Sequence, residues 1–405
     1  PFSRFVPHFA RERLERLLLG RGYRNETRLV GNYRDPGTEE AAWVASPSEV
    51  WSHVECPFKH FAGHGLSLKV QRKPTPAAAQ LGTWGHDMLA GAWQRAIDSG
   101  QSPRELPDER WLAFLAEAAG ELRQRESAAI DEPRLFLLDR LAQRLREVVL
   151  AHAHRYRRGE WRPLAVEQRF NPAGGERVLP ALRFAIDDGR SGWLKGKIDR
   201  IDVAETASGR WVLVYDWKQR ADEALSRAYL TGERLQAFLY LLAVSAAWSD
   251  AMPAGVCIAP LNPARLGKAG DDRPEDEQRM VRYRPRGMYD TAAVHLLDQR
   301  GSDLVADLRT KKDGDFMHYA EARPAGEIRE RLTLAEQMLR DSGRQVLKGE
   351  VIVLPLLEFQ RLACERCDFR PVCRFDRALN DVRVAHTDLP RVTVADGDDA
   401  ANEED

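Results

Sequence analysis

The chain has 405 residues, of which 43% are hydrophobic and 30% are charged, and its formal net charge is -1. This balance is typical of a globular protein and excludes a disordered chain, which combines low hydrophobicity with a high net charge. No apolar run is long enough to span a membrane and no signal-peptide pattern opens the chain, so we expect a cytoplasmic protein.

The first 45 residues are expected to contain a helix over residues 7–20, followed by a linker or docking segment. Because the chain begins with Pro1 rather than methionine, we expect a longer parent protein. The folded core is expected to begin at Ser46, which suits a helix N-cap, in a helix that runs to about Phe61. Helical apolar spacing then continues over residues 81–98, 108–125 and 131–157, which include a helical insertion at about 100–160.

The pattern changes at Pro163. Four successive strands are predicted over residues 164–170, 178–186, 193–203 and 210–218, because β-formers there are separated by Gly-rich and Asp-rich turns. A helix over 221–248, a strand over 255–261 and helices near 290–310 and 325–348 follow. This order predicts an α/β fold in which helices flank a central mixed sheet. We expect one domain over residues 46–380 and an acidic, flexible tail over 381–405.

The strand that ends at Lys218 carries the first chemical signal. Its sequence runs from Arg210 through an apolar stretch to Asp216-Trp217-Lys218. Side chains alternate along a strand, so Asp216 and Lys218 are expected on the same face of the sheet. Alone, this pattern would also fit an ordinary ion pair at a strand end.

A second carboxylate lies in the preceding strand. If the two strands form a hairpin, Asp199 lies beside Asp216, and two carboxylates form a site for a hard cation such as Mg²⁺ or Mn²⁺. Such a metal activates water for phosphodiester hydrolysis. The Lys218 ammonium would orient that water or neutralise charge on the phosphate.

Three further residues are candidates for the same site. Gln236 and Tyr240 lie one turn apart on one face of the next helix, although surface and core positions would give the same spacing. His86 follows a glycine near the start of a helix. It suits a structural role, or a third metal ligand beside two carboxylates.

Taken in order, these residues resemble the RecB-like branch of the PD-(D/E)xK nuclease superfamily over roughly residues 46–376. The resemblance implies a restriction-endonuclease-like core with helical insertions. It also implies a role for each candidate: metal ligands at His86, Asp199 and Asp216, assisted by the Trp217 carbonyl; a catalytic lysine at Lys218; and contacts with DNA from Gln236 and Tyr240. Gln219-Arg220 departs from the small hydroxyl residue and glycine that often follow the family's lysine. Glu167 is interpreted as a structural acidic position of the family.

Four cysteines form a second candidate site. Cys364, Cys367 and Cys373 lie within ten residues, and Cys56 supplies a fourth thiol far earlier in the chain. Four thiolates suffice for one zinc ion or one iron-sulfur cluster. The unequal spacing favours a [4Fe-4S] cluster and resembles the iron-sulfur members of the RecB-like branch, including the AddB-type components of helicase-nucleases. Cys257 lies in an apolar run and is predicted to be a buried small hydrophobic residue.

The sequence has no Walker A motif, so another chain or region would have to unwind DNA. The resemblance therefore implies an exonuclease that acts on single-stranded DNA ends beside a helicase partner in double-strand break repair. Two alternatives stay open. One is a stand-alone or CRISPR-associated defence nuclease of the same fold, and the other is a DNA-binding scaffold that has lost its nuclease activity.

Overall fold

The computed structural model describes residues 33–34, 41–69, 78–128, 130–175, 178–187, 189–220, 233–264, 272–300, 304–306, 308, 310–312, 316, 320–358, 361–378 and 380–384. The helix expected at 7–20, the start of the helix expected at 221–248 and residues 385–405 of the tail expected over 381–405 lie outside these residues. The first part of that tail is described, and Arg383–Val384 form a short strand there. Within the described residues, no helix is long and apolar enough to cross a membrane.

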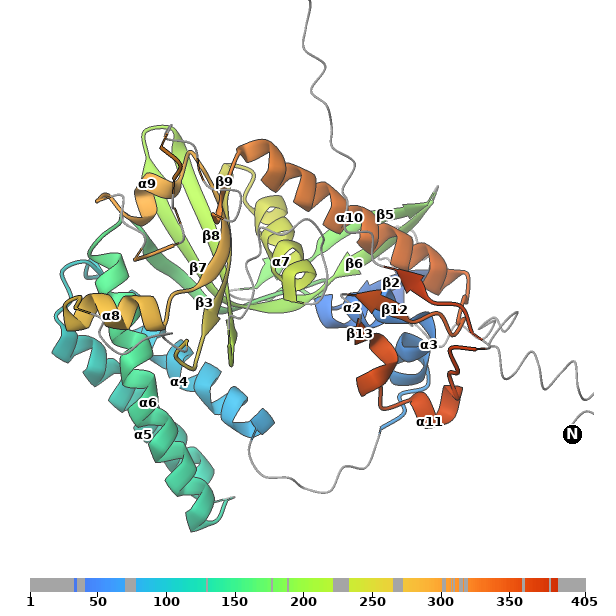
Figure 1. Cartoon of the computed structure of the whole chain (residues 1–405), viewed down its shortest axis with the longest axis horizontal. Coiled ribbons are helices and arrows are strands. Elements are labelled where there is room, and N and C mark those ends of the chain that lie inside the picture. The colour runs from blue at the N-terminus through green and yellow to red at the C-terminus, as the bar shows by residue number, and fades with distance from the viewer. Residues whose placement is uncertain are drawn as a thin grey trace, which may run out of the picture.

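A mixed sheet of seven strands forms the centre of the fold (Figure 1). Its spatial order is β11-β10-β9-β8-β7-β3-β4, with β8 and β9 parallel and with β7 antiparallel to both β3 and β8. The strands are β3 (Arg162–Asn171), β4 (Leu179–Pro180), β7 (Gly196–Thr206), β8 (Gly209–Lys218), β9 (Ala251–Pro260), β10 (Arg286–Asp290) and β11 (Ala322–Arg323). The fold class predicted from the sequence is confirmed.

Helices cover both faces of this sheet. In β8, Leu213, Tyr215 and Trp217 pack into the core of one face, whereas Val212 and Val214 pack into the core of the other. Burial on both faces explains why this strand is almost continuously apolar in sequence. The first core includes α4 (Ala78–Asp98), α5 (Asp108–Ser127) and α6 (Glu132–Tyr156), and the second includes α7 (Glu233–Ala247) and α10 (Ala325–Leu347).

A second sheet, with the order β1-β2-β6-β5, packs beside α10. It contains β1 (Tyr33–Arg34), β2 (Ala41–Ala45), β5 (Leu182–Asp187) and β6 (Arg190–Leu194). A Cβ atom at Gly343 of α10 would lie 3.1 Å from both Ile186 and Trp43, so this helix lies directly on the sheet. The core boundary predicted at Ser46 therefore needs correction, because Trp43 of β2 is fully buried upstream of it.

Helices α2 (Pro47–Glu55) and α3 (Pro57–His60), together with the π-helical turn Phe61–Gly65, lie next to a third small sheet, β13-β12-β14. The backbone N–H of Phe58 donates to the carbonyl of Ile352 at 3.1 Å, which joins the two ends of the domain. This region also contains β12 (Leu356–Glu358), β13 (Arg361–Leu362), the 3₁₀ turn Ala363–Arg366, α11 (Arg370–Cys373) and β14 (Arg383–Val384).

Four predicted elements differ from the structure. The strand predicted over 178–186 is two strands, β4 in the central sheet and β5 in the second sheet. The helix predicted from Ser46 to Phe61 is interrupted at Cys56, which has an extended backbone. The strand predicted over 193–203 is two strands, because the chain leaves the second sheet after Leu194 and enters the central sheet at Gly196. Near 290–310, the described residues contain only the four-residue helix α9 (Val294–Leu297), and the apolar residues there pack from turns. A further short helix, α8 (Glu275–Arg282), follows β9.

Candidate active site

Three acidic residues lie in a row across adjacent strands of the central sheet. The register of β3 with β7 places Glu167 beside Asp199, and the register of β7 with β8 places Asp199 beside Asp216. The predicted juxtaposition of Asp199 and Asp216 thus agrees with the strand pairing.

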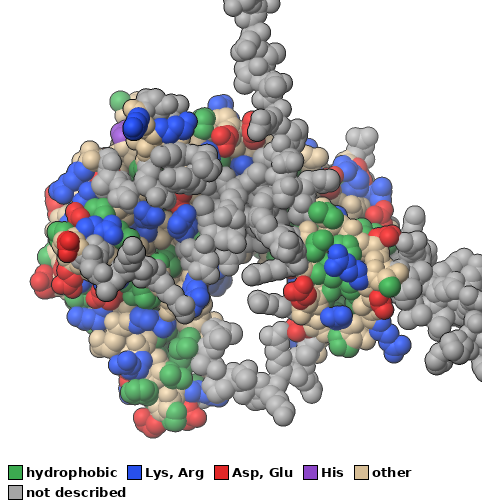
Figure 2. Space-filling view, viewed as in Figure 1, with side chains coloured by type: hydrophobic (Ala, Val, Ile, Leu, Met, Phe, Trp, Pro, Cys, Tyr) green, Lys and Arg blue, Asp and Glu red, His purple; other side chains and the backbone are tan. Residues whose placement is uncertain are grey.

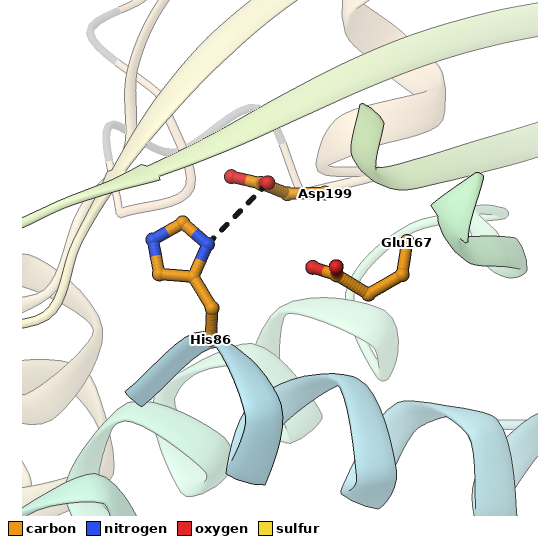
Figure 3. Close-up of side chains that lie close together, drawn as sticks. All are labelled: His86, Glu167 and Asp199. Carbon is orange, nitrogen blue, oxygen red and sulfur yellow. Dashed lines mark ion pairs between the residues drawn. The ribbon is translucent and has the colours of Figure 1, made fainter. Parts of the chain in front are cut away.

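His86 of α4 reaches this row from one side. Its Nδ1 lies 3.4 Å from Oδ1 of Asp199. One potential ligand atom from each of His86, Glu167 and Asp199 lies within 4.8 Å of the other two (Figure 3). A cation in this position would receive one imidazole nitrogen and two carboxylates, a donor set suited to Mn²⁺ or Mg²⁺.

Asp199 is oriented by the neighbouring strand. Its Oδ2 accepts a hydrogen bond of 2.7 Å from the backbone N–H of Trp217, and the residue is buried. This contact leaves Oδ1 facing His86. The Trp217 side chain points away into the core next to α4, so only the backbone of this residue contacts the site.

Asp216 lies outside the group of three and has a different set of contacts. Its Oδ2 lies 2.8 Å from the Lys218 ammonium, which confirms that the two side chains share a face. Its Oδ1 lies 3.3 Å from Nε2 of Gln236, and that nitrogen lies 3.0 Å from the Tyr240 hydroxyl. The i, i+4 pair singled out in the sequence therefore contacts the candidate site.

Glu167 is the residue whose place in the site the sequence did not predict. It adopts φ of +49°, in the left-handed region that side chains other than glycine rarely occupy, within an otherwise extended strand. Such local strain is concentrated at functional sites. The strand register shifts between Pro163 and Ala165, so alternation counted from the start of β3 does not locate this side chain.

Burial and charge act in opposite directions on the pKa values of these groups. Burial raises the pKa of Glu167, and the ion pair with Lys197 counters only part of that rise. Burial alone would lower the pKa of His86, but the hydrogen bond and charge of Asp199, with the charges of Glu167 and Asp216, raise it overall. The site thus has an excess of negative charge that a cation would neutralise.

A buried ion pair supports the strands beneath the site. Arg200 Nε lies 3.0 Å from Asp202 Oδ1, and the Tyr156 hydroxyl donates to Asp202 Oδ2 at 3.1 Å. The guanidinium carbon of Arg200 lies 3.6 Å from the ring centre of Tyr215. Arg200 follows Asp199 in β7, and Tyr215 precedes Asp216 in β8. Their packing therefore holds the backbone that carries both carboxylates.

The four predicted cysteine ligands occupy one region of the fold. Burial raises the pKa of the Cys364 thiol to about 12, and negative charge on Cys56, Cys373 and Cys367 raises it further. These three thiols therefore lie close enough to Cys364 to affect its charge. No three of them lie within 4.8 Å of one another among the described residues. Cys257 is fully buried, as predicted.

The sequence profile of the PD-(D/E)XK nuclease superfamily matches residues 44–374. The chain belongs to this superfamily. The resemblance inferred from its ordered motifs is therefore confirmed.

The chain is also similar to curated relatives, which are named as the B component of an ATP-dependent helicase/deoxyribonuclease. It is 30% identical to this component from Symbiobacterium thermophilum, over 88% of this chain and 32% of that protein. The equivalent proteins from Moorella thermoacetica and Geobacillus kaustophilus are each 30% identical, over 89% and 83% of this chain and 32% and 30% of the relative. The chain thus spans about a third of the length of these relatives.

Proposed function

We propose that this chain is the metal-dependent nuclease module of a helicase-nuclease that trims single-stranded DNA ends during double-strand break repair. The observation that carries the proposal is the row of Glu167, Asp199 and Asp216 with Lys218 beside it. The names of the similar proteins supply the helicase and the DNA substrate. We also propose a cytoplasmic location, because the cysteine spacing suits a metal site rather than the disulfide framework of a secreted protein.

The donor set fits a hard divalent cation. His86, Glu167 and Asp199 form the compact group, Asp216 is the next carboxylate along the row, and the Trp217 carbonyl is the predicted backbone ligand. When bound, Mg²⁺ or Mn²⁺ would activate water and balance charge on the phosphodiester. Because Glu167 belongs to the compact group, we add it to the ligands expected from the sequence.

The remaining residues act directly on the substrate in this proposal. The Lys218 ammonium, held 2.8 Å from Asp216, provides a positive charge where negative charge develops on the phosphate. Gln236 and Tyr240 form a hydrogen-bonded pair against Asp216. The pair holds this carboxylate in position and presents polar groups to the DNA strand.

We further propose that Cys56, Cys364, Cys367 and Cys373 bind a [4Fe-4S] cluster. The spacing in the sequence supports iron and sulfur rather than zinc, because three thiols lie within ten residues and the fourth lies 308 positions earlier, whereas tetrathiolate zinc sites commonly use two close pairs. The cluster would link α3 to the C-terminal sheet.

The test of the nuclease is cleavage of a labelled single-stranded oligonucleotide with Mg²⁺ or Mn²⁺. Lys218→Ala and Asp216→Asn should each lower kcat by at least about 100-fold, because the first removes the positive charge proposed beside the phosphate and the second removes a negatively charged metal ligand. EDTA should abolish cleavage by the unaltered protein. Unchanged melting temperatures would show that both variants fold.

Two results would overturn this function. Full activity in either folded variant would exclude the assigned site. A protein that binds DNA without metal-dependent cleavage would be a scaffold rather than a nuclease. Blocking the 5′ or the 3′ end of the oligonucleotide tests whether the enzyme is an exonuclease, since cleavage with both ends blocked requires an endonuclease.

A further inference from the structure

Helices α5 and α6 form a hairpin that packs beside α4 at the lower left of Figure 1. Along α6, Phe136, Arg140 and Arg144 follow one another at intervals of four residues, so they share one side of the helix. Phe136 is 63% exposed, more than any other large hydrophobic residue in the described part of the chain. An aromatic side chain so exposed has no packing role in this fold.

A pocket of about 440 Å³ lies on the same side of α6. Its apolar lining comes from Leu81 of α4 and from Leu137 and Leu141 of α6. The polar lining consists of Arg140, Gln143 and Arg144, with no acidic side chain. The pocket therefore combines an apolar surface with a positively charged rim. Figure 2 shows hydrophobic and basic side chains together on the surface that α5 and α6 form.

The two arginines of this rim differ from others on the hairpin. Arg123 pairs with Asp139 at 3.3 Å, and Arg125 pairs with Asp87 at 2.6 Å. Among the described residues, no carboxylate oxygen lies within 4.0 Å of a guanidinium nitrogen of Arg140 or Arg144. Both cations are thus available to an anionic ligand.

We propose that this side of α6 binds a single-stranded DNA segment that continues into the active site, an inference that rests on the nuclease function proposed above. Arginines bind successive phosphates, and an exposed aromatic ring stacks on a base. A base unstacked from its neighbours fits the apolar pocket, whereas the bases of a duplex are already stacked. Leu81 of the pocket and His86 of the metal group lie on the same helix α4, five residues and about 7.5 Å apart along its axis, so one strand of DNA can reach both.

Equilibrium binding tests this inference without cleavage. The probe is a fluorescein-labelled oligothymidine in EDTA, and anisotropy reports the dissociation constant at several salt concentrations. The variant Arg140→Ala/Arg144→Ala should bind about 10-fold more weakly and reduce the slope of log affinity against log salt by about 1.4, since each phosphate contact on a single strand contributes about 0.7. Phe136→Ala should weaken binding roughly fivefold or more, through loss of stacking.

Arg146→Ala is the matched control. Arg146 is an exposed arginine of the same helix, turned about 200° from Arg144, so its removal changes the net charge without altering the proposed surface. Its oligothymidine affinity should stay within about twofold of the unaltered protein. A control that weakens binding as much as the double variant would overturn the site, because only net charge would then matter.

Cleavage kinetics separate this inference from the nuclease function. With a long strand, the double variant should raise KM and leave kcat unchanged, and with an oligonucleotide too short to reach α6 it should match the unaltered enzyme. If DNA affinity and KM are unchanged in Arg140→Ala/Arg144→Ala and in Phe136→Ala while the unaltered protein cleaves DNA, the α6 site is excluded. The proposed nuclease function is then unaffected. If no protein cleaves but binding changes as expected, the nuclease function fails and the DNA site stands.

Discussion

Asp199 is oriented by contacts from different parts of the chain. His86 approaches one carboxylate oxygen from α4, and the Trp217 N–H donates to the other from β8. Glu167 of β3 completes the compact group. A buried carboxylate with both oxygens engaged cannot rotate freely, so its geometry is fixed before metal or DNA binds.

The part played by Glu167 can be measured by titrating the metal. Glu167→Gln removes one negative ligand, so half-maximal cleavage should require about 10- to 100-fold more Mn²⁺. The control, Glu205→Gln, changes an exposed glutamate of β7 that pairs with Arg162. An unchanged Mn²⁺ requirement in Glu167→Gln would return Glu167 to the structural role assigned from the sequence.

At the scale of elements, the site depends on how closely α7 packs on the strands. Gly196 begins β7, and a Cβ atom there would lie 2.8 Å from Phe170 and 3.3 Å from Tyr240. Phe170 is fully buried and has no space into which to move. This glycine therefore allows β3, β7 and α7 to approach one another at the position where Tyr240 contacts the site.

The change Gly196→Ala should lower the free energy of unfolding by about 1–3 kcal/mol, because an extra methyl group must displace packed rings. Urea denaturation measures this effect. Gly120→Ala is a control of opposite sign, since nothing lies within 4 Å of that position in α5 and alanine favours helix over glycine by about 1 kcal/mol. Equal stability of Gly196→Ala and the unaltered protein would show that the strands can relax.

At the scale of the whole molecule, residues distant in sequence are joined around the cysteines. The small core of Val353, Cys364 and Phe375 packs against Phe58 of α3. The Arg383 guanidinium also donates to the carbonyl of Val54. The proposed cluster would add a further link between these two segments, because Cys56 lies in the first and the other three cysteines lie in the second.

Metal analysis of the purified protein tests this arrangement. About four iron atoms per chain are expected for a [4Fe-4S] cluster, and Cys367→Ser should lose the iron and the brown colour and lower the melting temperature. Cys257→Ala should keep the iron, since Cys257 is buried in the central core next to Tyr289. One zinc atom per chain and no iron would replace the cluster with a tetrathiolate zinc site.

The sequence alone determined the features that depend on local periodicity. Alternation placed Asp216 and Lys218 on one face, and helical spacing placed Gln236 beside Tyr240, where the structure has both pairs.

Tertiary structure decided what depends on distant segments. Glu167 lies beside His86 and Asp199 only because of the register of β3 with β7. The chain also changes sheets between Leu194 and Gly196, because hydrogen bonding to β2 stabilises one side of that break and hydrogen bonding to β3 the other. Periodicity is a property of neighbouring residues, whereas register and layer are selected by burial between segments far apart in the chain.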